Sequence, residues 1–127
     1  MAELDCDVTL GESDAVVRVA GAVDLYSAAV LREHLLDVIR SGHSRLIVDL
    51  ERVTFIDSTG LGVLIGALKR ARDAGGGMQV IGRGVEVDKV FRITGLYRIL
   101  PLHASVQAAR AAFAASADTP PVAATRR

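Results

Sequence analysis

The chain has 127 residues, half of them hydrophobic, and it carries 15 basic and 15 acidic residues, so its formal net charge is zero. This length and composition predict one folded domain rather than a disordered chain. A neutral chain with 4% aromatic residues lacks the clustered positive charge and the stacking platforms of a nucleic-acid binder. The single cysteine, Cys6, allows neither an intramolecular disulfide nor a cysteine-based zinc site, and we expect no cofactor.

The N-terminal residues have neither the basic start nor the apolar core of a signal peptide. No apolar run approaches the roughly 18–20 residues that a membrane span requires. We therefore expect a reduced, soluble, cytoplasmic protein that binds neither a membrane nor nucleic acid.

The first half of the chain predicts a hairpin, a helix and a buried strand. Residues 4–10 are weakly strand-like and residues 15–21 are β-branched and apolar, with a Gly-Glu-Ser-Asp turn between them. A near-continuous apolar run at residues 46–50 is typical of a strand buried on both faces of a partly parallel sheet. Between these segments, apolar residues recur at three- and four-residue steps and predict a helix: Ala28, Leu31, Leu35, Val38 and Ile39.

The second half predicts further helices and strands. They are a helix at 63–71, a short strand at 78–81, a helix ending at Thr94, an edge segment at 99–102 and an alanine-rich helix at 105–115. Gly95 suits the left-handed residue that commonly ends a helix.

The predicted order, ββαβαβα(β)α, describes a single α/β domain in which about four helices cover a mixed sheet of four to five strands. We assign this domain to residues 1–115. Residues 116–127 show no periodicity, and we expect a disordered C-terminal tail there.

One predicted strand-to-helix turn concentrates the chemically distinctive residues. Residues 55–62 read Phe-Ile-Asp-Ser-Thr-Gly-Leu-Gly. Asp, Ser and Thr are preferred helix N-caps, so capping alone is the simpler explanation of Asp57, Ser58 and Thr59. The N–H groups and the dipole at a helix start also favour a phosphate. We predict that Ser58 is a cap whose exposed hydroxyl is reversibly phosphorylated, with Thr59 as the competing acceptor.

A second turn, at residues 21–28, places Asp24 just before the first predicted helix, where it is another N-cap candidate. If the strands before the two turns run parallel, both turns lie at the same end of the sheet. Open α/β sheets bind their partners at that end. We therefore expect Asp24, Tyr26 and Ser27 to share a surface with Asp57.

Other chemistries have weaker support in the sequence. A serine nucleophile needs a base, and nothing places a histidine beside Ser58. The hydrolase elbow also has glycine two residues before its serine, where this chain has Ile56. Gly82-Arg83-Gly84 is only half of a dinucleotide fingerprint. A small serine hydrolase and a nucleotide-binding regulator remain alternatives, and we predict that the protein is not an enzyme.

Several segments together resemble a STAS domain, over about residues 4–115. They are residues 21–28, Asp49-Leu50 leading to residues 55–64, Thr94-Gly95-Leu96 and Leu100-Pro101-Leu102. Within that family the chain resembles the bacterial anti-sigma factor antagonists. It departs from them at Tyr97, where an acidic residue is frequent.

The resemblance implies a switch without catalysis. The unphosphorylated protein would bind an anti-sigma factor that is also a serine kinase, with an ATP-binding, histidine-kinase-like fold, and would thereby release the sigma factor. Phosphorylation of Ser58 would end this binding, and a PP2C-type serine phosphatase would restore it. The alternative within the family is a STAS module in another complex, such as a lipid-transport ATPase or a stress-sensing scaffold.

The expected partner surface has ten residues: Asp24, Tyr26, Ser27, Asp57, Ser58, Thr59, Gly60, Leu61, Gly62 and Val63. We expect Gly60 and Gly62 to let a partner backbone approach closely. Leu61 and Val63 are expected to supply apolar contact. We expect the protein to be a monomer or a weak dimer.

Overall fold

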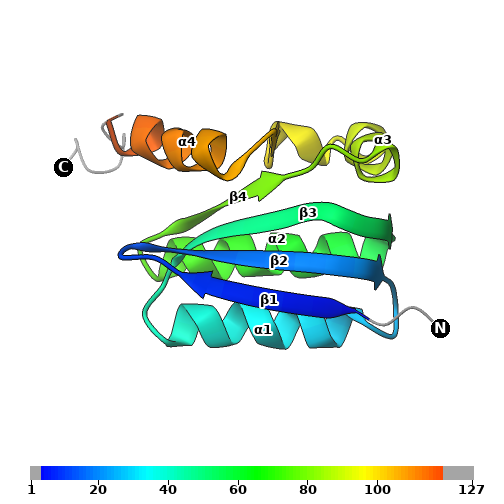
Figure 1. Ribbon diagram of the computed structural model, residues 1–127, viewed down its shortest axis with the longest axis horizontal. Coiled ribbons are helices and arrows are strands. Elements are labelled where there is room, and N and C mark those ends of the chain that lie inside the picture. The colour runs from blue at the N-terminus through cyan, green and yellow to red at the C-terminus, as the bar shows by residue number, and fades with distance from the viewer. Residues whose placement is uncertain (1–3, 119–127) are drawn as a thin grey trace.

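A five-stranded sheet in the order β1-β2-β3-β4-β5 forms the centre of the protein, in a computed structural model that describes residues 4–118 (Figure 1). Its strands are β1 (Asp5–Leu10), β2 (Asp14–Val23), β3 (Arg45–Ile56), β4 (Gly77–Ile81) and β5 (Leu102–His103). β1 pairs antiparallel with β2, and all other neighbouring strands pair parallel. The predicted α/β fold with a mixed sheet is therefore confirmed.

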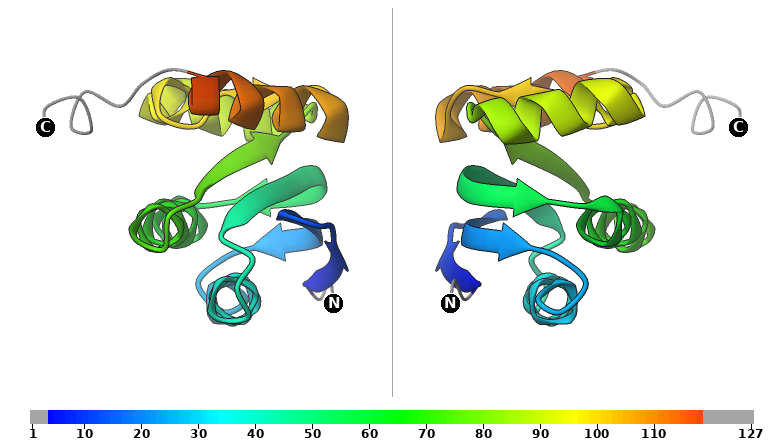
Figure 2. Two further views of the ribbon diagram at one scale, coloured as in Figure 1. Left: turned by 90° about the vertical axis from the view of Figure 1, so that its left-hand side faces the viewer. Right: turned by 90° about the vertical axis from the view of Figure 1, so that its right-hand side faces the viewer.

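Within residues 4–118, four α-helices pack around the sheet. They are α1 (Ala28–Arg40), α2 (Ser58–Asp73), α3 (Val85–Thr94) and α4 (Val106–Asp118), with a short 3-10 helix, η1 (Leu96–Arg98), after α3. Figure 2 shows α1 and α2 together along one side of the sheet, whereas α4 lies beside β4. α3 packs against β3 and adds Val87 and Phe91 to the main core. None of the described helices is long and apolar enough to cross a membrane.

Burial on both faces explains the apolar run of β3. Leu46, Val48 and Leu50 face the main core, which α1 and α2 cover, whereas Ile47 belongs to a smaller core beneath α4. Fully burying one such side chain contributes about 1.5–3 kcal/mol, so these alternating contacts hold helices to both faces. Gly95 ends α3 with a left-handed φ of 76°, as predicted.

Several element boundaries differ from the sequence-based prediction, and α2 begins at Ser58 rather than at residue 63. β3 continues beyond Leu50 to Ile56, because its second half stays paired with β2. Only Leu102 of the predicted edge segment at 99–102 lies in a strand, and η1 precedes this segment. α4 runs to Asp118, so the first three residues that we assigned to the tail are helical. The rest of that tail, residues 119–127, lies outside the described residues.

The parallel pairing of β2 with β3 positions the two turns. Val23 and Ile56, the last residues of these strands, are partners in the register, and the Asp57 N–H donates to the Val23 carbonyl at 3.2 Å. Both strand-to-helix turns therefore lie at the same edge of the sheet, as we expected.

Candidate functional site

The N-terminus of α2 is capped by Asp57. Its carboxylate Oδ1 accepts hydrogen bonds from the backbone N–H groups of Thr59 at 3.0 Å and Gly60 at 3.2 Å. Two of the N–H groups that a helix start leaves without partners are thereby satisfied. The cap is therefore Asp57, and the prediction that Ser58 itself caps the helix is wrong.

The two neighbouring hydroxyls have different surroundings. Ser58 is the first residue of α2 and is exposed, and within residues 4–118 its hydroxyl makes no hydrogen bond. Thr59 is half-buried and lines a depression between α1 and α2 that Arg32 also lines. Ser58 thus presents the more accessible hydroxyl.

The next two residues face the interior. A Cβ at Gly60 would lie 2.6 Å from Val23 Cγ1 and 2.9 Å from Ile56 Cγ1, so the close packing of α2 on β2 and β3 requires glycine there. Leu61 is 7% exposed and belongs to the main core. Packing within the domain therefore occupies both residues and leaves little of their surface open to a partner.

The remaining two residues of the predicted surface reach solvent. Gly62 is exposed, and a Cβ there would have no atom within 4 Å. Val63 is half-buried and lines the depression between α1 and α2. Both residues therefore keep a surface that a partner could contact.

The turn between β2 and α1 is held by its own polar side chains. Asp24 Oδ1 accepts hydrogen bonds from the N–H groups of Tyr26 and Ser27, both at 3.0 Å. The Ser27 hydroxyl donates to the Ala22 carbonyl at 2.7 Å and accepts from the Asp24 N–H at 2.9 Å. The hydrogen bonds to the Asp24 carboxylate, above all the one from the Ser27 N–H, lower the pKa of Asp24.

The helix after this turn begins at Ala28, so Asp24 does not occupy the N-cap position of α1. Ser27 does, but its side chain makes no capping bond and folds back toward β2 instead. The prediction of Asp24 as a helix N-cap is therefore wrong in detail, because the carboxylate orders the turn that precedes the helix.

Among the described residues, four large apolar side chains are exposed at this edge of the sheet, and we call them the apolar rim: Leu25, Tyr26, Phe55 and Val85. Tyr26 is 87% exposed and was predicted at this surface. The other three were missed. Each lies at or just after the carboxyl end of a parallel strand, and that signal appears only once the strand order is known.

No hydrogen bond joins a histidine to Ser58 in the part of the chain that the structure describes. His43 lies 3.2 Å from the Ser41 hydroxyl, and His103 Nε2 lies 2.8 Å from Gln79 Oε1. The Cys6 thiol is half-buried on β1, and burial raises its pKa to about 11. Within residues 4–118 we also find no group of three or more His, Cys, Asp or Glu that could hold a metal ion.

Known proteins match most of this chain. The STAS domain model matches residues 6–109. The anti-sigma-B factor antagonist of Bacillus subtilis (strain 168) is 38% identical over 101 residues, which cover 80% of this chain and 92% of that protein. The protein of the same name from Staphylococcus aureus (strain NCTC 8325 / PS 47) is 32% identical over 93 residues, covering 73% and 86%.

Solved structures agree with this match. A crystal structure of an anti-sigma factor antagonist from Mycobacterium paratuberculosis has a TM-score of 0.79 at 26% identity, covering 87% of this chain and 94% of that one. The structure of the anti-sigma factor antagonist SpoIIAA in its unphosphorylated form has a TM-score of 0.61 at 18% identity, and the match covers 94% of this chain and 100% of that one. At this identity the similarity concerns the fold alone. The chain therefore belongs to the STAS domain family, and over most of its length it is similar to relatives named anti-sigma factor antagonists.

Proposed function

We propose that this protein is an anti-sigma factor antagonist that acts in the cytoplasm as a phosphorylation switch and is not itself an enzyme. Its unphosphorylated form binds an anti-sigma factor that is also a serine kinase, and this binding releases the sigma factor. Phosphorylation of Ser58 ends the binding, and a PP2C-type phosphatase restores it. The names of the relatives support the antagonist role.

The observation that carries the switch is the exposed hydroxyl of Ser58 at the start of α2. Asp57 already caps the helix, so a phosphate on Ser58 displaces no hydrogen bond within the described residues. The positive end of the helix dipole lies beside it and favours an added negative charge. The fold can therefore carry the phosphate without rearranging.

The same phosphate strongly disfavours a docked partner. It adds a charge of about −1.5 to −2 at pH 7. The exposed apolar rim offers contact area to a partner at this edge of the sheet. A doubly charged group inside such a contact costs several kcal/mol when it is not paired. About 3 kcal/mol corresponds to more than a hundredfold in affinity, which is enough for an on–off response.

Thr59 is the less favourable acceptor. It is half-buried and lines the depression between α1 and α2. A kinase would have to reach into that depression to phosphorylate it, whereas Ser58 is open to solvent. We therefore assign the phosphate to Ser58.

Capture from the native cytosol, with the unphosphorylated chain as bait and Ser58→Glu as the control bait, identifies the kinase. Calorimetric titration with that purified kinase then tests the switch. We expect Ser58→Ala to bind within about twofold of wild type and Ser58→Glu to bind at least about tenfold more weakly. Equal affinity of Ser58→Glu and wild type would remove the electrostatic basis of the switch.

The kinase and ATP provide the second readout. Wild type should gain one phosphate by intact mass and lose its affinity, whereas Ser58→Ala should stay unmodified and bound. A phosphate on Ser58→Ala would move the acceptor elsewhere, with Thr59 first. Labelling of Ser58 by a serine-reactive phosphonate, which we do not expect, would instead favour a hydrolase.

A further inference from the structure

A groove runs between α1 and α2 along most of the length of α2. It consists of two adjoining depressions of about 310 Å³ and about 500 Å³, which share Leu36 and Arg70 in their linings. The first depression begins at Thr59 and the second ends at Ala74. At 1.5 Å per residue, α2 covers roughly 22 Å between these two residues, which is about the length of four helical turns.

The floor of the groove is apolar and open. Leu36 is buried, and Val63 and Ile39 are half-buried. At Gly62 and Gly66 an added Cβ would have no atom within 4 Å, so the missing side chains there serve no packing within the domain. Two glycines one helical turn apart on an open face allow the backbone of another helix to approach α2 closely.

The walls of the groove are mainly cationic, although the chain as a whole has no net charge. Arg32 and Arg40 of α1 and Arg70 of α2 line it, against a single acidic residue, Asp73, at its far end. This excess of positive charge favours an acidic occupant.

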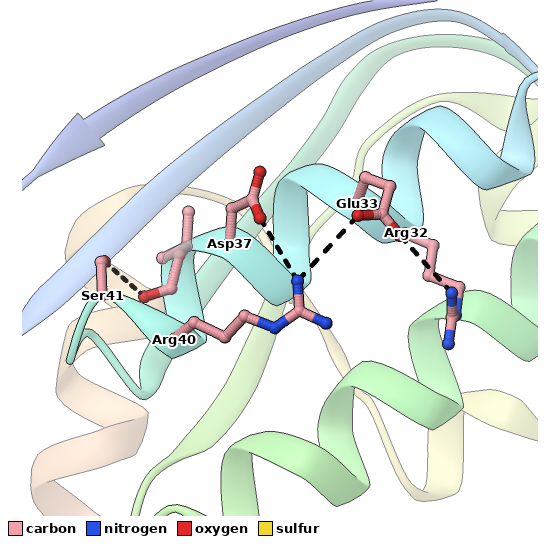
Figure 3. Close-up of polar contacts among 6 residues, drawn as sticks. Arg32, Glu33, Asp37, Arg40 and Ser41 are labelled. Carbon is pink, nitrogen blue, oxygen red and sulfur yellow. Dashed lines mark hydrogen bonds and ion pairs between the residues drawn. The ribbon is translucent and has the colours of Figure 1, made fainter.

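Two of the three arginines already form ion pairs, but these pairs are exposed and can be exchanged for new partners. Arg32 lies 3.6 Å from Glu33, and Arg40 lies 3.4 Å from Asp37 and 4.0 Å from Glu33 (Figure 3). All four of these side chains are more than half exposed, and such surface pairs contribute little stability. Arg70 has no ion pair within the described part of the chain.

The groove also lies next to the proposed phosphorylation site. Thr59, which lines the groove at the N-terminal end of α2, directly follows Ser58 in the sequence. We propose that an acidic amphipathic helix of the anti-sigma factor docks in this groove, with its apolar side over the glycines and its carboxylates on the arginines. This inference rests on the proposed function and adds the mode of docking. A helix laid in a groove between helices is a recurrent mode of peptide recognition.

Charge reversal at two matched positions tests the proposal, with the kinase identified by cytosolic capture as the titrant. Arg70 and Arg72 are both exposed in the last turn of α2, but only Arg70 lines the groove. Either change to Glu disturbs the helix dipole equally. We expect Arg70→Glu to lower affinity at least about tenfold and Arg72→Glu to stay within about twofold. Reversing the matching carboxylate of the partner to Arg should restore binding to Arg70→Glu.

Filling the groove provides an independent variant. Gly66→Leu places a bulky side chain in the open space of the floor, and Gly66→Ala adds only a methyl group at the same position. We expect Gly66→Leu to weaken binding about tenfold and Gly66→Ala to bind within about threefold of wild type. Thermal unfolding of each variant shows that it is folded.

The outcomes separate the two proposals. If wild type binds no anti-sigma factor kinase, the proposed function fails and the groove assignment fails with it. If wild type binds and Ser58→Glu does not, but Arg70→Glu and Gly66→Leu both bind like wild type, the switch stands and the groove proposal is overturned. Selective loss in Arg70→Glu and Gly66→Leu supports it.

Discussion

The two strand-to-helix turns at the carboxyl edge of the sheet are built on the same plan but expose different chemistry. In each, an aspartate Oδ1 accepts hydrogen bonds from the N–H groups two and three residues later, at 3.0 and 3.0 Å for Asp24 and at 3.0 and 3.2 Å for Asp57. The residue directly after the aspartate is exposed in both turns, but it is Leu25 in one and Ser58 in the other. Only the second turn presents a hydroxyl at that position.

At the third residue after each aspartate, the first turn has a hydroxyl and the second turn has none. Ser27 has a hydroxyl that bonds twice to the turn itself, whereas Gly60 has no side chain because Val23 and Ile56 leave no room for one. One turn therefore uses its serine to hold its own structure. The other holds its structure with aspartate and glycine, and this leaves its serine available for chemistry.

The largest effect on folding is expected at Gly60. In Gly60→Ala the new methyl group meets Val23 and Ile56 at less than 3 Å, and overpacking of this kind costs about 1–3 kcal/mol. The matched change Gly62→Ala meets no atom, and it should stabilise α2 by up to about 1 kcal/mol through helix propensity. Urea unfolding of both variants checks this, and equal stabilities would contradict the packing argument.

A smaller effect is expected from removing each serine hydroxyl. Ser27→Ala leaves the Ala22 carbonyl and the Asp24 N–H without that partner, which costs about 1 kcal/mol in a half-buried site. Ser58→Ala removes no hydrogen bond within the described residues and should change the free energy of unfolding by less than about 0.5 kcal/mol. Urea unfolding again provides the measurement. If Ser58→Ala lost more free energy of unfolding than Ser27→Ala, our assignment of a structural role to the Ser27 hydroxyl and of none to the Ser58 hydroxyl would be contradicted.

The smallest expected effect is a pH dependence of the stability that Asp24 contributes. Its pKa is lowered in the folded state, so its carboxylate contributes stability above the unfolded value of about 3.9, and this contribution is lost as the pH falls through the folded pKa. We therefore expect the stability difference between wild type and Asp24→Asn to be constant near pH 6 and to shrink below about pH 4. Leu25→Ala, a non-titrating change in the same turn, is the control, and its stability difference should stay constant with pH.

The sequence predicted the elements well where one residue pattern decides them. Three- and four-residue spacing of apolar residues located α1, and glycine after Thr94 located the end of α3. β3 was predicted too short, because after Leu50 its second half has two exposed residues for each buried one and the apolar run ends. Pairing with β2, a contact between distant parts of the chain, keeps that half in the sheet.

The candidate site was predicted in its location but not in the direction of its side chains. The Asp-Ser-Thr-Gly signature located the turn. The packing of Gly60 and Leu61, however, depends on Val23 and on core residues that are distant in the sequence. The apolar rim and the groove between α1 and α2 likewise combine residues from several elements. Local pattern cannot show such surfaces, because they form only when the strands are in order.

Phosphopeptide mapping of the wild-type chain, after incubation with its anti-sigma factor kinase and ATP, tests the central claim most directly. The contrast between the two turns predicts a single phosphate on Ser58 and none on Ser27 or Thr59. A phosphate on Thr59 or Ser27, with Ser58 unmodified, would contradict it.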